Sequence, residues 1–227
     1  TVRGDPTITA LAAFSASPEG TLAYQSGAAE PTRFVWVDRS GKELSAVPES
    51  DNMAEPALSP DEKRVAWHRP DQGGSDDLWL LDLGRATSSR FTFDPSEDVT
   101  PVWSPDGSRI VFSSSRKGNP DLYEKPASGA TEEKVLLQTA SSKFPDDWSG
   151  DGKYLLYEES DPKTLSDLWL LPLFGDRKPV PYLKTPFNEA HAQFSPDGKW
   201  IAYVSDEAGR TEIFVQSFPA SGGKWQI

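Results

Sequence analysis

The side chains with the most chemical potential in this 227-residue chain are acidic and amide groups that gather in four short clusters. Carboxylates held side by side can attract a cationic ligand or act as a general acid and base. Each cluster comes shortly before an apolar residue followed by Ser, so its use depends on the element that carries that pair. The cluster residues are Asn52, Glu55, Glu97, Asp98, Asp146, Asp147, Asn188, Glu189 and His191.

The apolar–Ser pair opens a phrase that recurs along the chain, in which Ser-Pro-Asp-Gly or a variant of it is followed by two short apolar runs. The apolar anchors Leu58, Trp103, Trp148 and Phe194 are 45, 45 and 46 residues apart, and a weaker copy lies near Ser17. A repeat period of this size indicates an array of similar structural units. The clusters therefore occupy equivalent places in successive units.

Each unit divides into four short strands, because its apolar runs are brief, rich in aromatic and branched residues, and bounded by Gly and Pro. The second and third strands are apolar on consecutive residues, as at Leu155–Tyr157 and Leu168–Leu171, which indicates burial on both faces of a sheet. This pattern predicts an all-β chain: a β-propeller of five four-stranded antiparallel blades in a single domain, 1–227. The expected blades are approximately 1–49, 50–93, 94–140, 141–187 and 188–227.

Five blades fit either a complete ring or part of a larger one. The chain stops at Ile227, where the outer strand of the fifth blade would finish, and neither end resembles a strand exchanged between the first and last blades. We therefore expect part of a larger ring, truncated at the C-terminus. In either ring, the connections from fourth to first strands lie around the mouth of the central channel. The nine cluster residues, placed in these loops, predict an acidic funnel for a ligand; the alternative is solvated loop surface.

Composition narrows the classes of partner. The chain has 23 basic and 35 acidic residues, a net charge of −12, which argues against nucleic acid or an anionic membrane surface as the main partner. It has no Cys, so disulfides and thiolate metal sites are excluded. No apolar run is long enough to insert in a membrane, and the first residues lack the order of a signal peptide. An export signal or anchor is therefore expected outside this segment.

The repeat, [FWL]-S-P-D-G-x-x-[VIL]-x-[FYW]-x-S followed by D-[LI]-[WYF], resembles the WD-like propeller repeat of the TolB family and matches four of the five blades well. Shorter segments, Lys125-Pro-Ala-Ser-Gly and Gly223-Lys224-Trp225-Gln226-Ile227, are similar to a narrower group. That group contains the TolB-like propellers attached behind a membrane anchor to bacterial serine/threonine protein kinases of the acidobacterial type.

This resemblance implies a non-catalytic, extracytoplasmic binding or sensor domain of a bacterium, in the periplasm or at the cell surface, that needs no cofactor. Its expected partner is a protein or peptide, and the negative charge favours a basic one. Two alternatives stay open. One is an accessory propeller that gates the substrate of a prolyl-oligopeptidase-like serine peptidase, and the other is a five-bladed glycosidase.

The Asp of each recurring turn could belong to a ring of carboxylates, but Asp at such a turn usually caps its own backbone. We interpret these four residues as structural: Asp61, Asp106, Asp151 and Asp197. The run from Asp147 to Glu158 also reproduces the spacing of a calcium-binding loop. We interpret that spacing as coincidence, because an extended strand would carry Glu158 far from Asp147.

Other catalytic and metal-binding patterns are weak. His68 and His191, the only histidines, are more than two blades apart in sequence, so neither a metal site nor a catalytic triad is expected. Neither a G-x-S-x-G elbow nor a G-x-G-x-x-G loop occurs, which argues against hydrolase or kinase chemistry in this segment. The pairs Asp76-Asp77 and Asp146-Asp147 could be glycosidase acids, but adjacent residues point apart.

Overall fold

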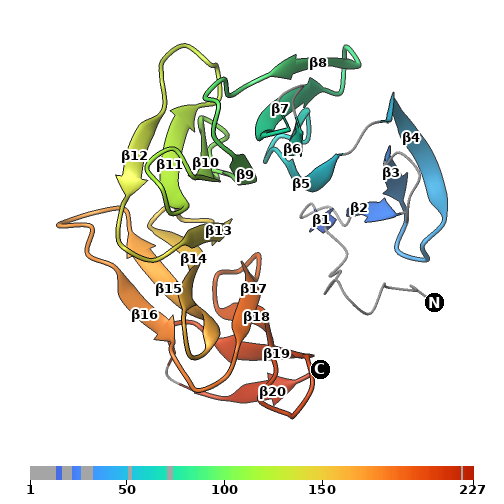
Figure 1. The fold of residues 1–227 in the computed structure, drawn as a ribbon. Helices are drawn as coiled ribbons and strands as arrows, with labels where there is room; N and C mark the ends of the chain where they lie inside the picture. Colours follow the sequence, from blue (N-terminus) through green and yellow to red (C-terminus); the bar gives the residue numbers. More distant parts are fainter. Residues whose placement is uncertain (1–13, 17–21, 27–32, 51–52, 71–73, 221) are drawn as a thin grey trace. The chain divides into compact units, whose positions relative to one another are not determined.

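The computed structural model describes residues 14–16, 22–26, 33–50, 53–70, 74–220 and 222–227. These residues form five four-stranded antiparallel sheets, and in each sheet four consecutive strands pair in chain order (Figure 1). This confirms the all-β prediction of four-stranded blades. None of the described residues forms a helix that could cross a membrane. The sheets divide between two compact units, residues 1–93 and 94–227, which we describe separately.

The first unit contains two sheets whose facing side chains share one core. Phe34 packs edge-to-face on Trp67, with ring centroids 5.8 Å apart, and Val47, Met53 and Leu81 complete the cluster. The strands are β1 (Phe14–Ala16), β2 (Leu22–Ser26), β3 (Arg33–Val37), β4 (Glu43–Ser50), β5 (Ala54–Leu58), β6 (Arg64–Pro70), β7 (Asp76–Asp82) and β8 (Thr87–Arg90).

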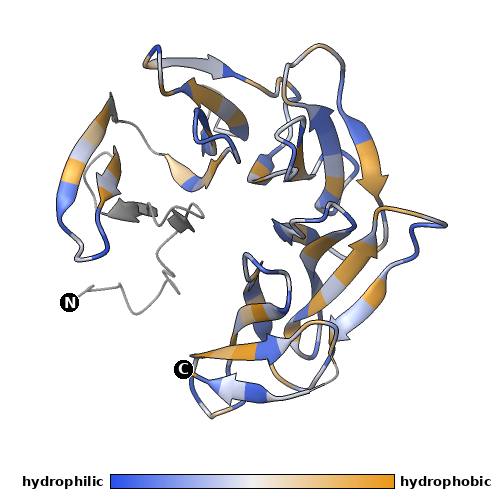
Figure 2. Ribbon diagram, turned by 180° about the vertical axis from the view of Figure 1, so that it is seen from behind, coloured by the Kyte–Doolittle hydropathy of each residue, from blue (hydrophilic) through white to orange (hydrophobic). Residues whose placement is uncertain are grey.

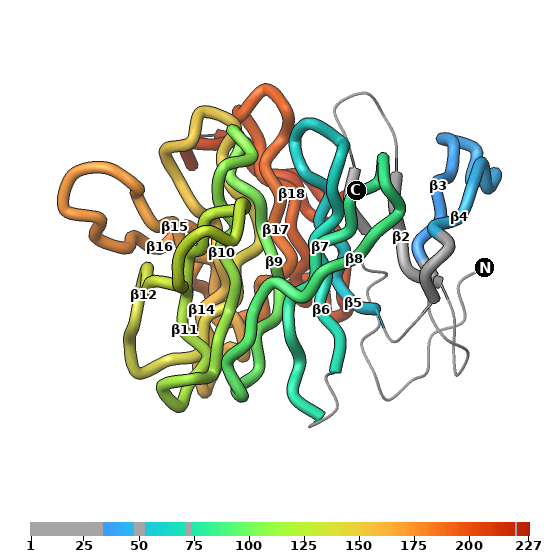
Figure 3. Tube along the Cα trace, turned by 90° about the horizontal axis from the view of Figure 1, so that it is seen from above, coloured from blue at the N-terminus to red at the C-terminus, as the bar shows by residue number. Residues whose placement is uncertain are grey.

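The second unit contains the other three sheets. Figure 3 shows that the loops joining its strands lie at the two ends of the sheets. The strands are β9 (Asp98–Trp103), β10 (Arg109–Ser114), β11 (Asp121–Pro126), β12 (Lys134–Leu137), β13 (Lys143–Trp148), β14 (Tyr154–Asp161), β15 (Leu165–Pro172), β16 (Val180–Leu183), β17 (Glu189–Phe194), β18 (Trp200–Ser205), β19 (Glu212–Ser217) and β20 (Lys224–Gln226).

The middle strands of the second unit are buried on both faces, as their continuous apolar runs predict. In β14, Leu155 and Tyr157 pack in a core with Val111 from the preceding sheet. Leu156, between them in sequence, packs in a second core with Tyr203 from the following sheet. Figure 2 shows the hydrophobic residues concentrated in the strands and mostly hydrophilic connections. The fourth sheet is therefore packed against both of its neighbours in the second unit.

The Ser-Pro-Asp-Gly turns close on themselves. Ser104 Oγ donates to Asp106 Oδ1 at 2.6 Å and accepts from the backbone N–H of Arg109 at 2.9 Å. The bond from Ser104 and those from Ser108 lower the pKa of Asp106 to about 2. The Ser-to-Asp bond recurs in the other three turns, at Asp61, Asp151 and Asp197. These carboxylates are thus engaged within their own turns.

The first strand of every sheet from β5 onward contains a β-bulge at the same place. In β17, for example, Ala190 pairs with Val204 and Gln193 with Ala202, so the strand holds one extra residue. Bulges of this kind re-aim a side chain. Three residues before the apolar anchor, φ is positive in β5, β9 and β17, and the residues are Glu55, Thr100 and His191.

The fourth sheet forms its bulge differently. Its residue three before the anchor is Pro145, whose ring fixes φ near −65° and excludes the left-handed region. Pro145 pairs with Tyr157 and Asp147 with Leu156, so the extra residue is Asp146. The bulges of β13 and β17 therefore present two polar residues, Asp146 and His191, at neighbouring first strands.

Candidate functional site

Most of the predicted ligand-binding residues lie within the first strands and not in the loops before them. Six belong to strands that start earlier than the sequence suggested, and only Glu97 and Asn188 immediately precede one. Asn52 lies outside the described residues. The correction has a physical cause: several of these polar side chains have partners inside the fold, so the backbone around them can be extended and buried. The six strand residues are Glu55, Asp98, Asp146, Asp147, Glu189 and His191.

Three of the predicted residues stabilise the fold. Asp98 is fully buried, and Arg116 Nη2 donates to both of its oxygens at 3.0 Å. Glu189 is 1% exposed and accepts a hydrogen bond from Thr185 Oγ1. The Asn188 side-chain oxygen accepts from the backbone N–H of Ser166 at 3.0 Å. A ligand would have to displace these partners, so we do not place the site on them.

Glu55 belongs to the first unit, where it contacts a histidine. His68 Nε2 lies 3.4 Å from Glu55 Oε2, and His68 Nδ1 lies 3.4 Å from Asp76 Oδ1. Burial alone would lower the pKa of His68, but the two carboxylates raise it to about 9. The imidazole is therefore a cation at neutral pH, and it balances one of the two acidic charges beside it.

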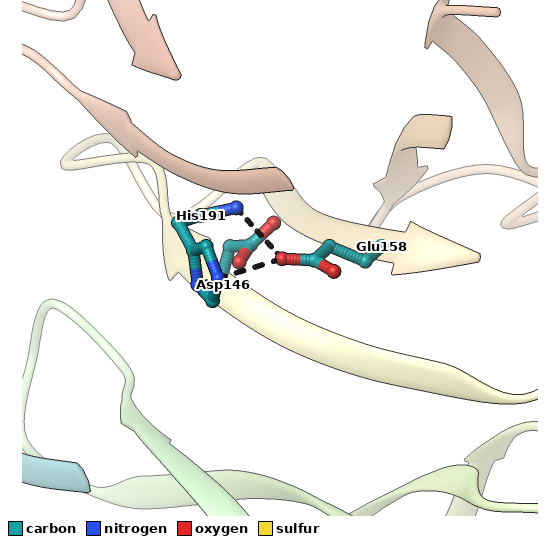
Figure 4. A group of neighbouring side chains, drawn as sticks. All are labelled: Asp146, Glu158 and His191. Carbon is teal, nitrogen blue, oxygen red and sulfur yellow. Dashed lines mark hydrogen bonds and ion pairs between the residues drawn. The ribbon is translucent and has the colours of Figure 1, made fainter. Parts of the chain in front are cut away.

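Asp146 and His191 come together in the second unit with a third residue, Glu158 (Figure 4). One donor atom of each lies within 4.8 Å of the others. Glu158, on β14, pairs with Phe144 on β13, so Asp146 two residues along β13 is its diagonal neighbour. The backbone N–H of His191 donates to Glu158 Oε1 at 2.7 Å, which ties β17 to the preceding sheet.

The carboxylates of this cluster are shielded from water while the imidazole reaches it. Glu158 is 9% exposed, and the Oδ2 atom of Asp146 is buried without a hydrogen-bond partner. The His191 side chain is 55% exposed, and its Nδ1 lies 3.7 Å from Glu158 Oε1. These three residues, called the acidic cluster below, thus combine two carboxylates largely shielded from water with an exposed histidine.

Burial has the largest effect on the pKa of Asp146, which belongs to the acidic cluster, and on that of Asp147 beside it. Burial raises the pKa of Asp146 well above its usual value, and the charge of Glu158 raises it further. The pKa of the adjacent Asp147 rises to about 6 through burial, opposed by hydrogen bonds from the backbone N–H groups of Phe194 and Trp148. Asp147 points into the backbone of β17, so it positions that strand.

Lysine and arginine side chains pair with several other buried carboxylates of the second unit but not with this cluster. Lys143 Nζ, fully buried, lies 2.9 Å from Asp121 Oδ1. By contrast, no lysine or arginine of the described residues pairs with Asp146 or Glu158. The arrangement can therefore share a proton between its carboxylates or accept a cation from outside.

Sequence reasoning missed Glu158 as part of a site. The calcium-loop spacing pointed to it, and the rejection of that loop was sound, because β13 and β14 form a hairpin with Asp147 opposite Leu156. The same hairpin carries Glu158 back past Asp146 on a neighbouring strand. The useful signal was therefore the antiparallel alignment of the two strands.

The family follows from comparison with known proteins. Residues 11–170 match the model of the TolB beta propeller domain. The chain belongs to this family. It is 26% identical over 116 residues to the Tol-Pal system protein TolB of Bordetella pertussis, a match covering 51% of this chain. The chain spans only 26% of that relative's length.

Two solved structures share the fold. A putative TolB from Agrobacterium tumefaciens superposes with a TM-score of 0.77 at 19% identity, covering 95% of this chain and 79% of that one. TolB from Acinetobacter baumannii gives a TM-score of 0.78 at 23% identity, covering 91% of this chain and 52% of that one. The sheets are therefore propeller blades, consistent with part of a larger ring. A TolB-like propeller is a non-catalytic interaction domain.

Proposed function

We propose that this chain is an extracytoplasmic, protein-binding propeller that serves as the sensor part of a larger, membrane-anchored bacterial protein. Its family and its relatives support this proposal: the Bordetella pertussis protein is named as part of the Tol-Pal system, and TolB proteins are periplasmic. The observation that carries the binding role is the acidic cluster of Asp146, Glu158 and His191, because its two carboxylates lack a lysine or arginine partner among the described residues.

The partner we propose presents a basic segment of extended chain. The net charge of −12 attracts such a segment from a distance, and a lysine or arginine side chain would neutralise the negative charge of the acidic cluster. On β17, His191 and Gln193 are both exposed and alternate with buried Ala192. Their side chains could hydrogen-bond to a peptide that lies along this strand.

Peptide binding tests the proposal directly. A fluorescein-labelled decapeptide rich in lysine and arginine, and a matched glutamate-rich decapeptide, are titrated with the protein in EDTA while anisotropy is measured. We expect the basic peptide to bind and the acidic one not to, with affinity falling as salt is added. The double variant Asp146→Asn/Glu158→Gln should weaken binding roughly tenfold.

The control replaces the exposed Glu132 by Gln, which removes one negative charge that does not belong to the acidic cluster. This change should leave the affinity for the basic peptide within a factor of about two. Equal binding of both peptides, or an affinity unaffected by the double variant, would show that the acidic cluster is not the binding surface. We propose a serine/threonine kinase as the larger protein, from the resemblance of the sequence to kinase-attached propellers. This predicts a kinase catalytic loop and an apolar span in the flanking coding sequence, and a nucleophile elbow there would overturn it.

A further inference from the structure

We infer that Asp146, Glu158 and His191 bind one divalent transition-metal ion, such as Zn²⁺ or Mn²⁺, at the seam between the fourth and fifth sheets. This site could not be expected from the sequence, because its residues come from three strands and its histidine is remote in sequence from the carboxylates. The hairpin of β13 and β14 and the bulge of β17 create it.

The geometry is close to that of a coordination sphere. Three donor atoms that share one ion at about 2.0–2.2 Å lie about 3.3–3.8 Å from one another in tetrahedral or trigonal geometry. The three donors of the cluster already lie within 4.8 Å of one another. A movement of up to about 1 Å, available to the exposed His191 side chain, would complete the site. Two carboxylates with one imidazole suit zinc and manganese, whereas calcium prefers a larger set of oxygens.

A buried carboxylate oxygen of the acidic cluster lacks a hydrogen-bond donor and points to a bound ligand. The Oδ2 atom of Asp146 is buried and makes no hydrogen bond, a situation that usually has a specific explanation such as a bound ion. Glu158 beside it is nine-tenths buried. At the preceding seam, Lys143 supplies the positive charge for Asp121. Here the chain supplies no lysine or arginine among the described residues, and a metal ion would take that role.

The same geometry suggests what the ion does. Asp146 and Glu158 belong to the fourth sheet and His191 to the fifth, so a bound ion would cross-link two neighbouring blades. Three protein ligands leave at least one position for water or for a donor atom of a partner. Because His191 is half exposed, that position would face solvent. Binding would raise the melting temperature with ion concentration, since the unfolded chain does not hold the three ligands together.

A shared proton is the competing occupant. Two carboxylates this close can share a proton when no metal ion is bound. A metal ion would displace this proton, so its binding must release protons into the buffer. Calorimetry in two buffers of different ionisation enthalpy counts those protons.

The test is isothermal titration calorimetry of the EDTA-treated, desalted protein with ZnCl₂ and MnCl₂, with CaCl₂ for comparison. We expect one equivalent of zinc or manganese to bind with proton release, and the melting temperature to rise. Glu158→Gln and His191→Asn should each weaken binding roughly tenfold or more. Asparagine is chosen because it tolerates the positive φ of His191, so the variant keeps its backbone. Glu132→Gln, an exposed charge change elsewhere, should not alter the affinity.

Melting temperatures of the variants in EDTA show that they are folded. Absence of zinc and manganese binding, or binding that both variants leave unchanged, would overturn the site and leave the shared proton as occupant. An anomalous-scattering peak at the three donors in zinc-soaked crystals would support it, and a peak elsewhere would contradict it. Because peptide binding is measured in EDTA, failure here leaves the proposed function untouched.

Discussion

The two histidines of this chain occupy mirrored arrangements in the two units. In the first, the bulge residue of β5 is an acid, Glu55, and the second strand supplies His68. In the second, the bulge residue of β17 is His191, and the second strand of the preceding sheet supplies Glu158. Glu158 and His68 stand at the same position of their repeats. The same two repeat positions are therefore used with acid and histidine exchanged, within one sheet in the first unit and across two neighbouring sheets in the second.

That exchange changes what each cluster needs. The His68 side chain is 13% exposed and lies between two carboxylates. The buried group is therefore the cation, and the two carboxylates stabilise its positive charge. In the other cluster the carboxylate side chains are largely shielded from water and the histidine is exposed. The first arrangement is therefore a structural ion-pair cluster whose cation comes from the chain. The second keeps negative charge that an external cation can neutralise.

The largest expected difference is in the pH dependence of stability. The pKa of His68 is raised from 6.5 to about 9, so the folded state favours the protonated form. Its contribution is full below pH 6.5 and is lost as the pH rises through 9, by up to about 3 kcal/mol. Urea unfolding at a series of pH values should show this loss, and His68→Gln should abolish it. A variant that kept the full slope would show that another group titrates there.

A smaller effect on the free energy of unfolding is expected at the bulges, where the strain of a positive φ can be measured apart from the role of the side chain. Thr100 holds the same left-handed conformation as Glu55 and His191, with φ 54°, although β-branched residues adopt it least readily. Thr100→Gly should therefore stabilise the second unit by about 1 kcal/mol in urea unfolding. Thr100→Ala keeps the Cβ atom and is the matched control, with no stabilisation expected. A destabilised glycine variant would mean that the Thr100 side chain makes contacts worth more than the strain.

How far the sequence could predict this molecule depends on the range of each signal. The turns were predictable because Ser, Pro, Asp and Gly act within a few residues, as the bonds around Asp106 show. The doubly buried middle strands were predictable because their apolar runs are local. The repeat also led to the family, and the matching model confirms that part of the resemblance.

The site could not be predicted in the same way, because it depends on alignments between strands. One extra residue in a first strand moves every following side chain to the other face, and nothing in the local sequence marks Asp146 as that residue. The fate of the acids also depends on distant partners. Asp98 and Asp146 look alike in sequence, but only Asp98 meets an arginine, Arg116, which lies 18 residues away.

The smallest expected effect compares the two histidines directly. His191→Asn, measured in EDTA at neutral pH, should change the free energy of unfolding by less than about 0.5 kcal/mol, against up to about 3 kcal/mol for His68→Gln. The reason is that His191 holds Glu158 through its backbone N–H, which asparagine retains, while its imidazole is half exposed. The measurement is the urea midpoint of both variants in one buffer. A loss for His191→Asn as large as that for His68→Gln would make the imidazole a structural partner of Glu158. The distinction between a cluster with a cation from the chain and a cluster open to an external cation would then fail.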